Sequence, residues 1–89
     1  MAVTCLAMPA QRSPAHLREV LAAQVRSRRL ALEVSQEQLA ERCGLHRTYL
    51  SGIERATRNV SLSTLELLAA GLECDAAQLL IRPARRVAD

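Results

Sequence analysis

Polar side chains suited to reading DNA recur at helical spacing near the middle of the chain. A helix would place the four of them on one side: Arg47, Thr48, Ser51 and Arg55. An arginine near the start of such a helix can bind the O6 and N7 atoms of guanine together, which contributes about 1–3 kcal/mol of discrimination between bases. The hydroxyl groups can bind a base or a phosphate. The pattern predicts a helix face that contacts the DNA major groove, the alternative being ordinary solvated side chains.

Two short helices that meet at Gly44 are expected to position this face. Ser35 is suited to cap the first of them, over residues 36–43, and Gln38 completes a capping box with it. Gly44 allows a turn with positive φ because it has no Cβ atom. The second helix is expected over about 46–55, with its apolar residues turned inward. Two helices joined in this way form a helix-turn-helix, whose second helix enters the major groove.

The stretch from Gln36 to Glu54 resembles the phage-repressor-like (Cro/C1-type) helix-turn-helix family of bacterial transcriptional regulators. The residues that match the family pattern are Gln36, Leu39, Ala40, Gly44, Leu50, Ser51, Ile53 and Glu54. The run from Arg47 to Arg55, followed by Arg58 and Asn59, is more narrowly similar to the controller proteins of restriction–modification systems. The resemblance implies an all-α fold, a compact five-helix domain of the lambda-repressor-like type with the helix-turn-helix at its second and third helices.

The resemblance also implies roles for residues outside the reading face. Gln36 matches a glutamine whose amide lies at a helix N-terminus against a DNA phosphate, where free amide hydrogens favour an anion. Arg29 and Glu54 match a buried ion pair that joins the first helix to the third and fixes the angle of the DNA-reading helix. Glu54 must be paired or exposed, since an unpaired buried carboxylate is strongly unfavourable. The resemblance leaves room for Arg58 to reach a base.

The remaining candidates for DNA contact each have an alternative. Tyr49 can contact the DNA backbone or a distorted base step, or it can pack against a neighbouring helix. His46 can approach a phosphate, or it can begin the second helix without further role. Arg55, Arg58 and Asn59 end or follow that helix and are expected to hold the adjacent DNA backbone.

Two positions depart from the family pattern at helix ends. Glu33 stands where the family has glycine after the first helix, and Ala56 stands where it has glycine or asparagine after the third. A left-handed backbone at either position would cost on the order of 1 kcal/mol. Either these loops differ from those of the family, or the fold absorbs the strain.

Composition favours a small DNA-binding protein over an enzyme. The chain has 89 residues and a net charge of +3, and each of its 12 cationic side chains is an arginine, whose fixed-charge fork suits phosphate and guanine. No nucleophile motif or phosphate-binding glycine loop is present, so neither catalysis nor a cofactor is expected. The three cysteines lack metal-ligand or disulfide spacing, which indicates buried thiols in a reducing cytoplasm. No apolar run is long enough for a membrane helix.

The apolar pattern predicts one helix-turn-helix domain over residues 14–81 between two tails. Residues 1–13 are expected to form a flexible tail, and residues 82–89 a basic one. The first helix is expected from Pro14 or Ala15 to Leu32. Its inward stripe consists of Leu17, Val20, Leu21, Val25 and Leu32.

Two further helices are expected after the helix-turn-helix. One should begin after Ser61 or Ser63, and a short one should follow Asp75. The apolar residues of this carboxyl-terminal part have no other evident partner in so small a chain. They are therefore expected to form the contact between two copies of the protein: Leu72, Cys74, Leu79, Leu80 and Ile81.

These observations lead to one functional prediction with two rivals. The chain is expected to bind a pseudo-palindromic operator in double-stranded DNA as a homodimer, with its reading helices about 34–36 Å apart, and to regulate transcription. The controller resemblance implies control of restriction–modification genes, and RNA polymerase is a further candidate partner. One rival is an antitoxin-type DNA-binding protein that also binds a protein partner. The other is a protein-interaction module whose DNA face has lapsed.

Overall fold

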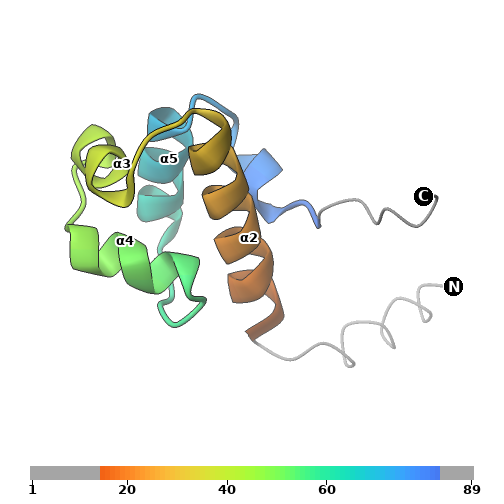
Figure 1. Cartoon of the computed structure of the whole chain (residues 1–89). Coiled ribbons are helices and arrows are strands. Elements are labelled where there is room, and N and C mark those ends of the chain that lie inside the picture. Colours follow the sequence, from red (N-terminus) through yellow and green to blue (C-terminus); the bar gives the residue numbers. More distant parts are fainter. Residues whose placement is uncertain (1–14, 83–89) are drawn as a thin grey trace, which may run out of the picture.

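Helices account for the regular structure of residues 15–82, which are the residues that the computed structural model describes (Figure 1). They are α2 (Ala15–Ala31), α3 (Gln36–Cys43), α4 (Arg47–Glu54), α5 (Leu62–Gly71) and the 3-10 helix η2 (Ala76–Leu80). The predicted all-α fold is confirmed, but the expected fifth helix is a short 3-10 helix. The predicted tails lie outside the described residues, apart from the exposed Arg82. No helix in the described range has both the length and the apolar character needed to cross a membrane.

The core is aliphatic and draws on every helix. Its fully buried large side chains are Val25, Leu39, Leu50, Ile53, Leu68 and Leu79. Val20 and Leu21 belong to the inward stripe of α2 as predicted, whereas Leu17 is 53% exposed. The expectation for Leu17 is wrong because its turn of α2 borders an open groove and not the core.

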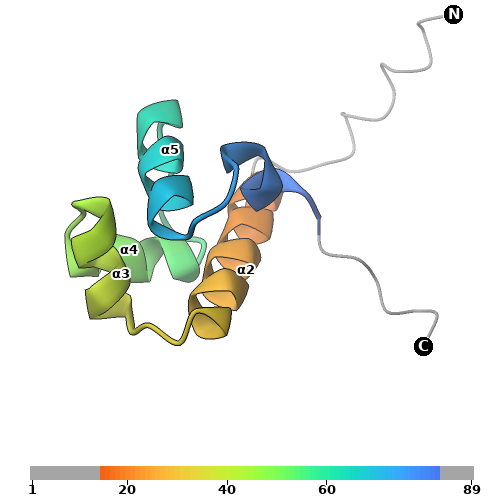
Figure 2. The same ribbon diagram turned by 90° about the horizontal axis from the view of Figure 1, so that it is seen from above.

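The α3–α4 pair forms the helix-turn-helix, and the other helices support it from one side. In Figure 1, α4 lies across the lower part of the molecule with α3 above it, and α2 and α5 stand upright beside them. α3 contacts both α4 and α5, while α2 contacts α4. Figure 2 shows η2 beside α2 and away from the helix-turn-helix, and η2 contacts α2 and α5. This arrangement keeps the helix-turn-helix at one end of the molecule.

Serine caps begin two of the helices. The Ser35 Oγ accepts a hydrogen bond from the Gln38 N–H at 3.0 Å, and the Gln38 Oε1 accepts one from the Ser35 N–H at 2.8 Å, which completes the predicted capping box. The Ser61 Oγ accepts from the Thr64 N–H at 3.1 Å, so Ser61 and not Ser63 caps α5. These bonds satisfy amide donors that the first turn of a helix leaves without partners.

Each described α-helix is followed by a residue with positive φ, and only one of the four is glycine: Glu33 (58°), Gly44 (72°), Ala56 (62°) and Glu73 (57°). In every case the next N–H donates to the carbonyl five positions earlier, at 2.9–3.3 Å: Val34 to Arg29, Leu45 to Ala40, Thr57 to Gly52 and Cys74 to Ala69. The loops at Glu33 and Ala56 therefore keep the left-handed geometry. The fold absorbs a cost on the order of 1 kcal/mol at each.

α5 packs closely on α3 at Gly71. A Cβ atom at this position would lie 2.5 Å from the Cys43 Sγ and 3.3 Å from the Leu39 Cδ1, so even alanine would force a neighbour to move. Burial raises the pKa of the Cys43 thiol, which therefore stays neutral at neutral pH. Cys43 acts as a small core residue, as its sequence position predicts, and the half-buried Cys74 packs at the edge of the core.

Candidate nucleic-acid interface

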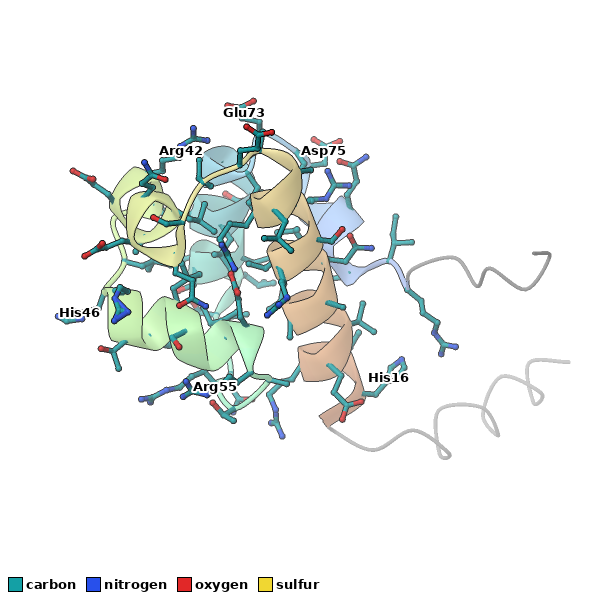
Figure 3. The ribbon with its side chains drawn as sticks, viewed as in Figure 1. His16, Arg42, His46, Arg55, Glu73 and Asp75 are labelled. Atoms are coloured by element: carbon teal, nitrogen blue, oxygen red, sulfur yellow. The ribbon has the colours of Figure 1, made fainter. Side chains whose placement is uncertain are left out.

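The first turn of α4 presents polar side chains to solvent. The side chains of Arg47 and Thr48 are exposed and make no hydrogen bond or ion pair with any residue from 15 to 82. His46 is the N-cap residue of α4 but makes no side-chain cap bond. Figure 3 shows His46 projecting outward at the start of the helix. A guanidinium, a hydroxyl and an imidazole are thus open to a ligand at one helix start.

The last turns of α4 carry a second polar pair. The Arg55 Nη1 donates to the Ser51 Oγ at 2.9 Å, with Arg55 exposed and Ser51 half-buried. In Figure 3, Arg55 lies at the opposite end of α4 from His46. The bond to Ser51 uses one donor of the guanidinium and leaves the others available. The polar surface therefore extends along the whole helix.

A buried ion pair beneath this surface holds α4 against α2. The Arg29 Nε lies 2.6 Å from the Glu54 Oε2, and the Arg29 Nη2 donates to the Glu54 Oε1 at 3.1 Å. The Arg29 Nη1 donates to the Val34 carbonyl at 3.0 Å, and the Gln36 Nε2 donates to the Glu54 Oε1, also at 3.0 Å. Because the Glu54 side chain is only 2% exposed, these bonds replace its lost hydration. The pair implied by the resemblance is present, and it ties α2, α3 and α4 together.

The Gln36 amide has an internal partner that the sequence did not predict. One of its two N–H groups is given to Glu54, so the second remains for another acceptor. Gln36 is the first residue of α3 and is half-buried. The helix N-terminus and the second N–H can together favour a phosphate.

The loop after α4 folds back onto the helix at Gly52. The Gly52 carbonyl accepts hydrogen bonds from the Thr57 N–H at 2.9 Å and from the Thr57 Oγ1 at 3.1 Å. A Cβ atom at Gly52 would lie 2.6 Å from the Arg58 Cγ and 3.1 Å from the Arg58 Nε. The absence of a side chain at Gly52 therefore leaves the space that the Arg58 side chain occupies.

Tyr49 and Asn59 meet across the same loop. The Tyr49 Oη donates to the Asn59 carbonyl at 2.9 Å, and the Arg58 Cζ lies 5.9 Å from the centre of the Tyr49 ring, within reach of a cation–π interaction. From α2, the Arg18 Nη1 donates to the Asn59 Oδ1 at 2.8 Å. Tyr49 therefore supports the loop from α4, and Asn59 is engaged through both its carbonyl and its side chain.

The predicted DNA-contact residues lie on α4, at its two ends, in the loop that follows it and at the start of α3. All nine are exposed or half-buried: Gln36, His46, Arg47, Thr48, Tyr49, Ser51, Arg55, Arg58 and Asn59. Sequence reasoning missed Arg18 and Thr57, which hold the loop. Arg18 precedes Asn59 by 41 positions, and no local pattern connects two residues so far apart.

The predicted contact between two copies is wrong for two of its residues. Leu72 is 3% and Leu79 0% exposed, and both belong to the chain's own core. They are buried because η2 folds back onto α2 and α5. Leu80 and Ile81 are exposed and Cys74 is half-buried, so these three remain on the surface.

An open apolar groove of about 290 Å³ lies near Leu80. It runs between the start of α2, the start of α5 and the end of η2, and its lining consists of Leu17, Arg18, Leu21, Asn59, Val60, Ser61, Leu62, Leu65 and Leu80. The lining includes Arg18 and Asn59, which are hydrogen-bonded to each other. The groove therefore borders the loop after α4.

The fold and the exposed α4 define a class of protein. A family model described as helix-turn-helix matches residues 25–79, which is more than half of the chain. The chain belongs to this helix-turn-helix family, of Cro/C1 type, and is a DNA-binding transcriptional regulator. The family is one of regulators and not of enzymes.

The relatives of the chain include control proteins of restriction–modification systems. The chain is 53% identical over 66 residues to the control protein C.SmaI of Serratia marcescens, covering 74% of this chain and 79% of that protein. The crystal structure of a hypothetical transcription factor from Neisseria matches with a TM-score of 0.74 and 49% identity over 75% of each chain. The controller protein C.Esp1396I bound to a 19-base-pair DNA duplex matches with a TM-score of 0.66 and 38% identity, over 71% of this chain and 84% of that chain. The resemblance drawn from the sequence is confirmed.

Proposed function

We propose that this protein binds a pseudo-palindromic operator in double-stranded DNA as a homodimer and thereby regulates transcription. The observation that carries the proposal is the exposure of Arg47 and Thr48 on a helix whose angle is fixed by the buried Arg29–Glu54 pair. The N-terminal residues of a reading helix contact base edges in the major groove. A DNA-bound relative with the same fold supports the same class of partner.

The residues of the interface divide into two roles in this proposal. Arg47 reads a guanine edge, and Thr48 contacts a base or a phosphate. The groups near helix ends and in the loop bind the DNA backbone on either side: Gln36, His46, Ser51, Arg55 and Arg58. Tyr49 and Asn59 act mainly by holding the loop, because both are already hydrogen-bonded within the chain.

The contact between two copies uses the apolar groove and its rim in this proposal. Leu17, Leu62 and Ile81 are 53%, 80% and 57% exposed, and Leu80 is 36% exposed. Large apolar side chains exposed together mark an interaction site. These residues replace Leu72 and Leu79 in the predicted interface, and two copies joined through them would present two α4 helices to one DNA duplex.

The regulated genes are those of a restriction–modification system in this proposal, because the relatives include control proteins of such systems. With no effector domain seen between residues 15 and 82, occupancy of the operator would follow the concentration of the protein. Activation would further require a contact with RNA polymerase, which transcription with purified components on an operator template would detect. This function places the protein in the bacterial cytoplasm with its DNA.

Selection of bound sequences from a random DNA pool tests the proposal. The expected result is a motif with two related half-sites whose centres are separated by about one helical turn. Binding to the selected duplex should weaken steeply and linearly on a log–log plot as salt rises, since phosphate contacts release counterions. An enriched pool without any shared motif would reject sequence-specific binding.

A further inference from the structure

The loop after α4 is tied to α2 as well as to α4, and this tie has a consequence for DNA reading. We infer that Arg18 is a positioning residue that holds Arg58 on the DNA-binding surface through Asn59. The inference rests on the proposed DNA-binding function and extends the set of residues that control it to the start of α2. Arg18 lies outside the helix-turn-helix, 29 positions before Arg47 in the printed sequence.

Arg58 is confined on its α4 side by two contacts. Its Cγ occupies the space that a Cβ on Gly52 would fill, and its guanidinium lies over the Tyr49 ring. Neither contact fixes the backbone from which the side chain extends. Arg58 is exposed, so its direction depends on how firmly the loop itself is held.

Asn59 supplies that hold because it directly follows Arg58 and is bonded on two sides. Its carbonyl accepts from the Tyr49 Oη at 2.9 Å, and its Oδ1 accepts from the Arg18 Nη1 at 2.8 Å. The Arg18 Nε is buried, so the arginine stem lies against the protein and its end is directed by packing. Without the bond from Arg18, Asn59 keeps its tie to α4 alone.

A loop held before binding loses less conformational freedom when it meets DNA. The positive φ of Ala56 makes this loop conformation less favourable, because a residue with a side chain is strained there. The bond from α2 therefore contributes to DNA affinity without touching DNA. Its effect should appear only when Arg58 is present to be positioned.

Double-mutant cycles on the selected operator test the inference. Arg18→Met keeps the apolar stem that lines the groove and removes the donor, and Arg58→Met removes the positioned guanidinium. Each is expected to weaken binding by about fivefold, the size of one modest hydrogen-bond contribution. The two together should weaken binding little more than Arg58→Met alone, because they act through one group.

Matched cycles separate positioning by Arg18 from a direct DNA contact and from a general loss of structure. Arg18→Met with Arg47→Met should be additive, since Arg47 is held by α4 and not by the loop. Arg26→Met removes the same charge from an exposed position of α2 and should leave operator affinity within about twofold. Asn59→Ala removes the acceptor of the same hydrogen bond. It replaces Arg18→Met in the cycles if Arg18→Met lowers the melting temperature.

Several outcomes would overturn the inference. Additive losses for Arg18 and Arg58 would make Arg18 a separate DNA contact, and equal coupling to Arg47 would indicate a general loss of structure. If the variant also forms a weaker dimer in sedimentation, and this accounts for the loss of affinity, Arg18 acts through the contact between two copies and not through Arg58. A wild-type chain without sequence preference would instead reject the proposed function itself, so the two failures are distinguishable.

Discussion

Two arginines of this chain, Arg29 and Arg47, show how the same side chain serves opposite purposes in different surroundings. Arg29 is 9% exposed and donates three hydrogen bonds, two to Glu54 and one to the Val34 carbonyl. The Arg47 side chain is exposed and makes no hydrogen bond or ion pair within the described part of the chain. One fixes where α4 lies, and the other is left for a partner.

The Arg29–Glu54 ion pair forms the junction between α2 and α4, and the exposed face of α4 forms the reading surface. The difference between the two arginines teaches that these two parts have to be built differently. A buried charge is tolerated only when its hydrogen bonds are completed within the protein. A side chain that is to recognise DNA must keep its donors unused until the partner arrives. Changes in the junction should therefore reduce stability, and changes on the surface should reduce binding.

The largest expected effect is at the junction. Arg29→Met removes the partner of a carboxylate that is 2% exposed, so it should lower the free energy of unfolding by about 3–5 kcal/mol. Urea denaturation followed by circular dichroism measures this change. The matched Arg47→Met variant should stay within about 0.5 kcal/mol of wild type, and an equal stability for both variants would remove the contrast between the two arginines.

The next effect is on binding and belongs to the reading surface. Arg47→Ala should cost about 1–3 kcal/mol of operator affinity and relax the preference at one base pair in each half-site. Its melting temperature should not change. Titration of a panel of operators with single base changes checks this, and a uniform loss on every operator would make Arg47 a phosphate contact.

A smaller effect on stability is expected where α5 packs on α3. Gly71→Ala places a Cβ against the Cys43 Sγ, and the strain should exceed the gain in helix propensity by about 1 kcal/mol. Thermal melting of the single variant and of the Gly71→Ala/Cys43→Ala double variant measures it. Recovery in the double variant is expected, and its absence would place the strain elsewhere.

The smallest change in stability is expected for Gly52→Ala, which should weaken operator binding instead. Gly52→Ala displaces the Arg58 stem, whose Cγ would lie 2.6 Å from the new Cβ. Since Arg58 is exposed, it can move, and the gain in helix propensity should keep the free energy of unfolding within about 1 kcal/mol of wild type. Operator affinity should fall about as much as for Arg58→Ala. Unchanged affinity would show that Arg58 needs no fixed direction.

Local signals in the sequence were enough to predict the helix-turn-helix. Ser35, Gln38 and Gly44 each act through their own neighbours, so the capping box and the first turn follow from residue type and spacing. The ion pair between Arg29 and Glu54 came from the resemblance, since 25 positions separate the two residues. Local spacing could not predict this ion pair, and the family pattern could.

Features set by tertiary packing escaped the sequence reasoning. A leucine in the last described helix can face its own core or a second copy, and only the return of η2 onto α2 shows that Leu79 is buried. Leu17 also misled the prediction. Its helical spacing matches the inward stripe of α2, but its turn borders the groove. The bond between Arg18 and Asn59 likewise depends on two segments that meet only in the folded chain.

The helix ends leave this fold with room for greater thermal stability. Glu33 and Glu73 both adopt a backbone that glycine accepts without a steric cost. Glu73 also lies on the opposite side of the molecule from Arg55 in Figure 3, and its ion pair with Arg42, at 3.6 Å between exposed groups, contributes little. Glycine at either site would relieve strain on the order of 1 kcal/mol. Such a thermostabilised scaffold would tolerate the weakening substitutions through which a new operator preference has to be evolved.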